Sequence, residues 1–71
     1  MDDIGDAERV AQMQRLAALK IEHRDLDMVI QVLAKEPSHD ELQLTRLKRK
    51  KLLLKDQIAR LEREIDPDVL A

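Results

Sequence analysis

The side chains best placed for chemistry form a basic cluster in the second half of the chain. The stretch LKRKKLLLKD, residues 47–56, combines lysine and arginine with leucine. Such a run could neutralise phosphates along a nucleic acid, or it could meet an acidic protein surface. No aromatic residue interleaves it and no DNA-reading motif surrounds it. We therefore expect a protein partner, with a nucleic-acid or ribosome-associated role as the alternative. The candidate partner surface consists of Arg46, Lys48, Arg49, Lys50 and Lys55.

His23 is the second candidate for chemistry. Asp27 lies one helical turn further on, a spacing that suits a hydrogen bond or two metal ligands on one face. A transition-metal site needs more ligands, and His39 lies far along the chain, so we expect no metal and no cofactor. If the chain folds back near residue 37, position 51 lies opposite position 23. His23, Asp27 and Lys51 then form one polar layer that fixes the pairing, and replacing both His23 and Lys51 with leucine should raise the melting temperature.

Residues suited to catalysis are scarce. The sequence has no cysteine, no nucleophile placed beside a base and no glycine-rich phosphate loop. Ser38 has the features of a helix cap and Thr45 those of a surface residue. We therefore expect that the protein is not an enzyme.

Two long helices must position these side chains. Pro37 divides the chain nearly in half and disfavours a helical conformation at Glu36. Ser38 and Glu41 have the spacing of a capping box, which predicts a second helix that starts at Ser38 or His39. We expect a single domain over residues 1–71, with one helix at about 7–35, a turn at 36–38 and a second helix at about 39–65.

Apolar residues recur at alternating steps of three and four residues in both predicted helices, which is the a/d pattern of a coiled coil. His23 and Lys51 are the polar interruptions. Amphipathic helices of globular proteins have a similar period, so the pattern favours coiled-coil packing without requiring it. We expect an all-α fold, an antiparallel two-helix hairpin that resembles a coiled coil. The predicted hairpin seam consists of Leu16, Leu19, Leu26, Ile30, Leu33, Leu44, Leu47, Leu54, Ile58, Leu61 and Ile65.

The seam does not use all the apolar residues. A single core in a chain of 71 residues without cysteine supplies little stability, and exposed apolar patches usually mark interfaces. We expect the hairpins to associate into a homo-oligomeric helical bundle, most simply a dimer. The protein would then be a small interaction module that presents a charged surface to another protein. The predicted oligomer interface consists of Ile21, Met28, Val29, Val32, Leu52 and Leu53.

Charge and hydropathy restrict the binding partners and the cellular location that we expect. The net charge of −2 disfavours non-specific binding of nucleic acid by the chain as a whole. No apolar run approaches the ~20 residues of a membrane span, and the acidic start MDDIGDAERV lacks the apolar stretch of a secretory signal. The stretch KLLLK, residues 51–55, could insert into a membrane surface, but no aromatic residue lies beside it to anchor it there. We expect a cytoplasmic protein without membrane contact.

Two stretches resemble the YdcH-like family of small bacterial proteins, and the resemblance covers about residues 13–65. LAALKIEHRDLDMVI matches the first half of the family pattern, with leucine at position 16 where the family usually has an aromatic residue. LKRKKLLLKDQIARL matches the second half. The resemblance implies a helical hairpin or coiled coil in the bacterial cytoplasm, with no known activity or ligand. The matching residues are Leu16, Leu19, His23, Leu26, Asp27, Ile30, Leu47, Lys48, Arg49, Lys51, Leu52, Leu54, Lys55 and Asp56.

Overall fold

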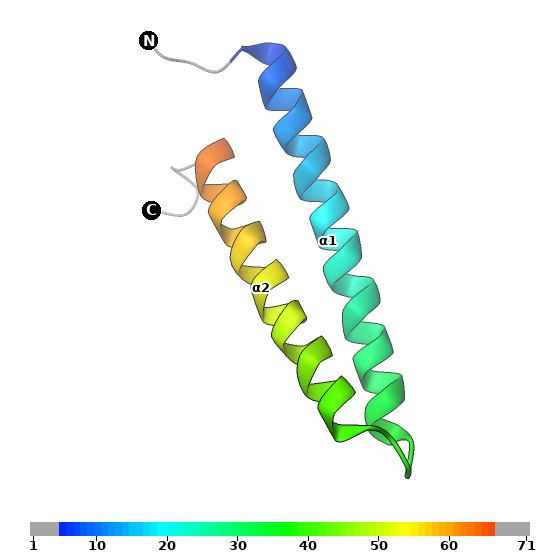
Figure 1. The fold of residues 1–71 in the computed structure, drawn as a ribbon. Helices are drawn as coiled ribbons and strands as arrows, with labels where there is room; N and C mark the ends of the chain where they lie inside the picture. Colours follow the sequence, from blue (N-terminus) through cyan, green and yellow to red (C-terminus); the bar gives the residue numbers. More distant parts are fainter. Residues whose placement is uncertain (1–4, 67–71) are drawn as a thin grey trace.

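The chain folds into two α-helices joined by a short turn. The computed structural model describes residues 5–66, in which helix α1 spans Asp6–Lys35 and helix α2 spans Glu41–Ile65. No strand occurs within this range. The helices lie side by side and run in opposite directions, with the turn at one end (Figure 1). The predicted all-α, two-helix hairpin is confirmed.

Helix α1 ends where the sequence predicts. Asp6 and Glu8 lie in its first turn, where negative charge interacts favourably with the helix dipole. At the other end Glu36 has extended backbone angles, φ −72° and ψ 126°, and its amide donates to the Leu33 carbonyl at 3.1 Å. Because Pro37 disfavours the helical conformation at the residue before it, the helix stops at Lys35.

Helix α2 begins two residues later than predicted. Asp40, and not Ser38, is its N-cap: the Asp40 carboxylate accepts hydrogen bonds from the amides of Leu42 at 2.9 Å and Gln43 at 3.2 Å. An aspartate directly before the first helical residue satisfies these amides as well as a serine does. The capping-box prediction is therefore wrong, and the turn covers residues 36–40 in place of 36–38.

The core lies along the seam between the helices. Among residues 5–66, four apolar side chains are buried, with exposed fractions of 6% to 9%. All four come from the predicted seam, and the other seam members are half-buried. The 3–4 spacing therefore places every predicted seam residue at least partly between the two helices. The buried four are Ile30, Leu44, Leu54 and Leu61.

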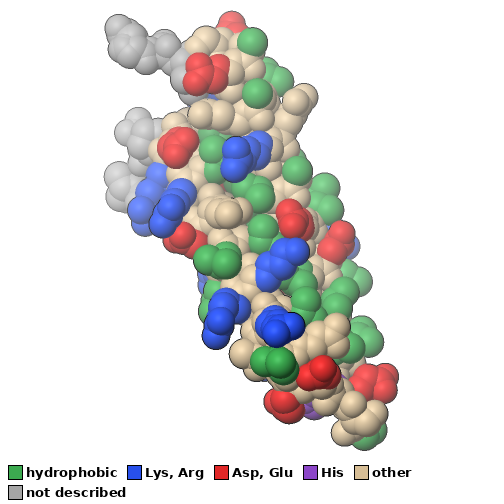
Figure 2. All heavy atoms as spheres, in the orientation of Figure 1, with side chains coloured by type: hydrophobic (Ala, Val, Ile, Leu, Met, Phe, Trp, Pro, Cys, Tyr) green, Lys and Arg blue, Asp and Glu red, His purple; other side chains and the backbone are tan. Residues whose placement is uncertain are grey.

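A second set of apolar side chains is exposed. Nine large ones within residues 5–66 have exposed fractions of 46% to 65%. In Figure 2, apolar side chains gather along the edge of α1 that is turned away from α2. Neither helix in this part of the chain has the length and hydropathy needed to cross a membrane. The exposed residues are Val10, Met13, Ile21, Met28, Val29, Val32, Leu42, Leu52 and Leu53.

Candidate functional site

An ion pair joins the two helices near the middle of the seam. The Lys51 ammonium lies 2.5 Å from Oδ1 of Asp27, and Gln31 donates a hydrogen bond to Oδ2 of the same carboxylate at 3.1 Å. The hydrogen bond from Lys51 holds the pKa of Asp27 below its ordinary value, because it favours the charged carboxylate more strongly than partial burial disfavours it. The structure therefore brings together two of the three residues of the predicted polar layer.

His23, the third residue of the predicted layer, lies in a neighbouring layer of the seam. In an antiparallel hairpin each a position packs against a d position of the other helix. With the turn at 36–40, this register sets His23 in the layer of Leu54, whereas Lys51 shares a layer with Leu26. The Nε2 atom of His23 is buried and has no hydrogen-bond partner. His23 therefore contributes no polar contact to the Asp27–Lys51 pair beyond its charge, which adds to the lowering of the Asp27 pKa.

Further polar contacts link the helices toward the open end of the hairpin. Lys20 and Glu62 form an ion pair at 3.2 Å, and Arg9 donates a hydrogen bond to the carbonyl of Ile65 at 3.4 Å. Lys20 and Glu62 both occupy e positions, which face each other across an antiparallel pair, so the heptad pattern could have predicted this contact once the register was known. Each is a surface contact that helps to align the helices.

The second histidine closes the turn. Nδ1 of His39 lies 2.7 Å from the carbonyl oxygen of Glu36, and Nε2 lies 2.5 Å from Oε1 of Glu41. Both partner atoms accept hydrogen bonds, so only a doubly protonated imidazole can donate to both. The Glu36 carbonyl and then the Glu41 carboxylate raise the pKa of His39. A protonated His39 therefore acts as a clamp between the end of α1 and the start of α2.

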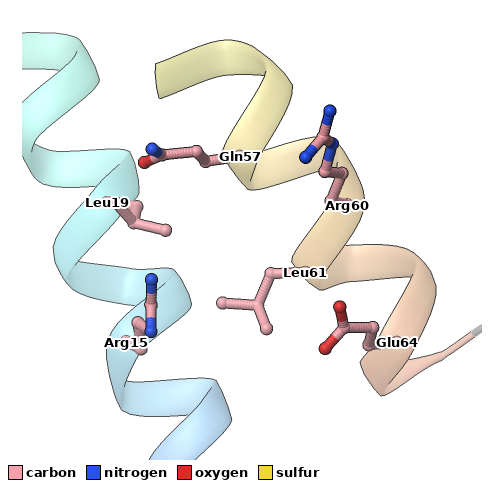
Figure 3. Close-up of a pocket in the computed structure, with 6 residues that line it drawn as sticks. All are labelled: Arg15, Leu19, Gln57, Arg60, Leu61 and Glu64. Atoms are coloured by element: carbon pink, nitrogen blue, oxygen red, sulfur yellow. The ribbon is translucent and has the colours of Figure 1, made fainter. Parts of the chain in front are cut away.

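A shallow pocket lies in the groove between the helices at the end far from the turn. Its volume is about 250 Å³, smaller than the ~300–1,000 Å³ of typical ligand pockets. Figure 3 shows Leu19 and Leu61 pointing into the space between the helices, with polar side chains around them. Within residues 5–66, no group of three or more histidine, cysteine, aspartate or glutamate side chains is close enough to hold a metal ion. The lining residues are Arg15, Leu19, Gln57, Arg60, Leu61 and Glu64.

The basic residues of the predicted partner surface are all exposed. None of them takes part in an ion pair with another residue of the described part of the chain. Lys48, Arg49 and Lys50 are consecutive, so their side chains leave α2 at intervals of about 100°. The five residues Arg46, Lys48, Arg49, Lys50 and Lys55 therefore surround the solvent-facing side of α2, and Lys and Arg side chains are visible over this helix in Figure 2.

The predicted oligomer interface is also exposed, but the structure divides it between the helices. Ile21 and Met28 are 60% and 54% exposed and occupy heptad positions farthest from the seam. Leu52 and Leu53 on α2 are 65% and 59% exposed, and as neighbours they point about 100° apart. The α1 and α2 residues of this set thus face different directions. The set comprises Ile21, Met28, Val29, Val32, Leu52 and Leu53.

The chain matches a known protein family. The family model described as "Protein of unknown function (DUF465)" matches residues 16–62, which include most of both helices and the whole turn. The match therefore covers the Asp27–Lys51 pair and the basic cluster. No curated protein and no solved structure matches the chain.

Proposed function

We propose that this chain, which belongs to the DUF465 or YdcH-like family of proteins of unknown function, is a small non-enzymatic helical module that self-associates and presents a charged surface to a protein partner. One observation carries the proposal: the hairpin buries four apolar side chains and leaves nine large ones exposed among the residues described. Solvent-exposed apolar side chains in this number are typical of a surface that another protein covers.

The accessible surface supports self-association. Nine large apolar side chains of residues 5–66 are 46% to 65% exposed, which is an excess of exposed apolar surface for a chain of 8.3 kDa. A single core in a chain of this length rarely supplies more than about 3–5 kcal/mol. A second copy that covered a standard ~800 Å² per partner would bury much of the excess surface. Association in a dimer would therefore stabilise the hairpin as well as define its assembly.

The basic residues of α2 support a partner beyond a second copy. Their ammonium and guanidinium groups are exposed on a chain whose net charge is −2, and they form no ion pair with other described residues. Such a local surface complements an acidic protein surface, because opposite potentials increase the association rate and the specificity. The same groups could follow a phosphate backbone, which keeps a nucleic acid as the second candidate partner.

Self-association is tested by light scattering over a dilution series of the wild-type protein. A dimer gives a mass near twice 8.3 kDa at high concentration and a lower average mass as dilution separates the copies. A mass of 8.3 kDa at every concentration, together with a cooperative thermal transition, would show a stable monomer and would overturn the proposal.

The partner class is tested by reversing three charges, with Lys48, Arg49 and Lys50 each replaced by glutamate. Loss of a protein captured from lysate by the wild type supports a protein partner. Retention of RNA or DNA that falls steeply with added salt and with the charge reversal supports the second candidate. Arg63→Glu, an exposed charge reversal near the end of the same helix, is the control for a general effect of net charge.

A further inference from the structure

A second apolar stripe runs along α1, on the side away from α2. Val10, Ile21 and Val32 are spaced eleven residues apart, and Ala17 and Met28 repeat at the same interval between them. Eleven residues are close to three helical turns, so equivalent positions drift by only about 20° per repeat and the stripe stays nearly parallel to the helix axis. Ile21, Met28 and Val32 are 60%, 54% and 63% exposed. The stripe is thus a continuous face that the hairpin leaves uncovered.

Opposite charges flank this stripe on its two edges. Arg24 and Asp25 lie between Ile21 and Met28, and because they are consecutive they point to opposite edges, about 100° apart. Lys35 repeats the cationic position eleven residues after Arg24, at the last residue of α1, whereas Glu36 lies past the end of the helix. Arg24, Asp25 and Lys35 are exposed, and none is in an ion pair with another residue in the range 5–66. The stripe therefore has a cationic edge at Arg24 and Lys35 and an anionic edge at Asp25.

This arrangement of charge distinguishes parallel from antiparallel pairing of two α1 helices. In a parallel pair in register, the cationic edge of one helix meets the anionic edge of the other, so Arg24 lies beside Asp25 of the second copy, and the same contact forms twice. In an antiparallel pair, like edges meet, and pairing about the midpoint between Ile21 and Met28 sets Arg24 near a second Arg24. Like charges across an interface disfavour a pairing and opposite charges favour it, so the sequence favours the parallel pair.

We propose that two copies of this chain pair through the outer face of α1, parallel and in register, with each α2 on the outside of the assembly. The inference rests on the proposed self-association and specifies its surface and orientation. Ile21, Met28 and Val32 would each meet their own counterpart, and Ala17 permits close approach of the helices. Arg24 and Asp25 form the flanking ion pairs between the copies. Leu52 and Leu53 lie on the other helix, outside this interface.

Single cysteines test the orientation, because the natural chain contains no cysteine. Ile21→Cys and Met28→Cys are prepared separately and oxidised with a glutathione redox buffer. A disulfide needs Cα atoms about 4.4–6.8 Å apart, so in the parallel pair each variant forms a covalent homodimer. Positions 21 and 28 are separated by about 10 Å along the helix, so a mixture of the two variants yields no covalent product joining one to the other. Leu53→Cys, equally exposed on α2, is the matched control and stays monomeric in denaturing gels.

Charge exchange provides a second test that does not depend on oxidation. Arg24→Asp and Asp25→Arg each place like charges at both flanking contacts, and each is expected to weaken dimerisation about tenfold. The double variant with both substitutions restores opposite charges and recovers the wild-type dissociation constant. An equimolar mixture of the two single variants also recovers it, because one chain is then anionic at both positions and the other cationic.

The outcomes separate this inference from the proposed self-association. A wild type that is monomeric at every concentration overturns both. Two results overturn the parallel α1 interface and leave self-association standing. In the first, Ile21→Cys and Met28→Cys link only to each other. In the second, Leu53→Cys forms a covalent dimer and the two α1 variants do not. A double charge variant as weak as the single variants has the same consequence. Covalent homodimers of both α1 variants together with recovery in the exchanged pair support the inference.

Discussion

Replacing Leu54 with alanine tests whether the seam holds the hairpin together. Leu54 is 6% exposed and packs between the helices, whereas its neighbour Leu53 is 59% exposed on the solvent side of the same helix. The two substitutions remove the same atoms one residue apart, so helix propensity changes equally in both variants. The difference between them therefore reports the packing of the seam.

The expected magnitude follows from burial. Removing a buried leucine side chain costs about 2–5 kcal/mol, and a hairpin of two helices can relax around the gap, so we expect about 2–3 kcal/mol for Leu54→Ala. Most of the Leu53 side chain is already in water, so Leu53→Ala should cost less than about 1 kcal/mol. A loss of 2–3 kcal/mol is most of the ~3–5 kcal/mol that a core of this size supplies.

The assay is urea unfolding followed by circular dichroism at 222 nm, at one fixed protein concentration. With a denaturant slope of about 1 kcal/mol/M for a small protein, Leu54→Ala should lower the unfolding midpoint by about 2–3 M and Leu53→Ala by less than about 1 M. Equal midpoints for the two variants, or a larger loss for Leu53→Ala, would refute the packing described for α2.

The remaining predictions concern the polar contacts. Asp40→Ala should lower the free energy of unfolding by about 1 kcal/mol, measured by urea unfolding, because α2 loses its cap. Ser38→Ala should leave the free energy of unfolding almost unchanged. A larger loss for Ser38→Ala than for Asp40→Ala would show that Ser38 is the cap after all. His23→Leu should raise the melting temperature, because Nε2 of His23 is buried without a hydrogen-bond partner. Lys51→Leu should lower it, because Asp27 loses its ion pair. A shift in the same direction for both variants would contradict the separation of the two layers. The raised pKa of His39 gives stability that is complete below the ordinary histidine value and is lost as pH rises through the raised value, with Glu36 and Glu41 favouring the charged ring and Lys48 opposing it. The melting temperature should therefore fall as the pH rises from below the ordinary histidine value through the raised one, and His39→Gln should reduce that fall. An unchanged pH profile would show that the clamp contributes nothing.

The hairpin could be predicted from the sequence because two independent signals agree. Pro37 stops a helix at the residue before it, and the 3–4 steps on either side define one apolar face for each helix. The proximity of Asp27 and Lys51 also follows from folding the chain near residue 37. These features depend on local backbone preference and on periodicity, and both can be read directly from the sequence.

Other features depend on choices that periodicity leaves open. Ser38 and Asp40 both suit a helix cap; in the structure Asp40 accepts the amide hydrogen bonds, and Glu41, which the capping box needs, contacts His39 instead. The equal distances of positions 23 and 51 from residue 37 predict the polar layer, but both are a positions, and antiparallel pairing of an a with a d position sets His23 opposite Leu54. The shallow pocket and the Lys20–Glu62 contact follow from that register and were not predicted.

The hairpin has a covered seam and an uncovered apolar face, and we propose that a second copy covers that face. Sedimentation equilibrium of the wild type beside the double variant Ile21→Asp, Met28→Asp measures this most directly, since both side chains lie on the uncovered face. The wild type should have a mass near twice 8.3 kDa, and the variant should have a mass near 8.3 kDa with reduced thermal stability. A wild type of 8.3 kDa with the same melting temperature as the variant would contradict the account.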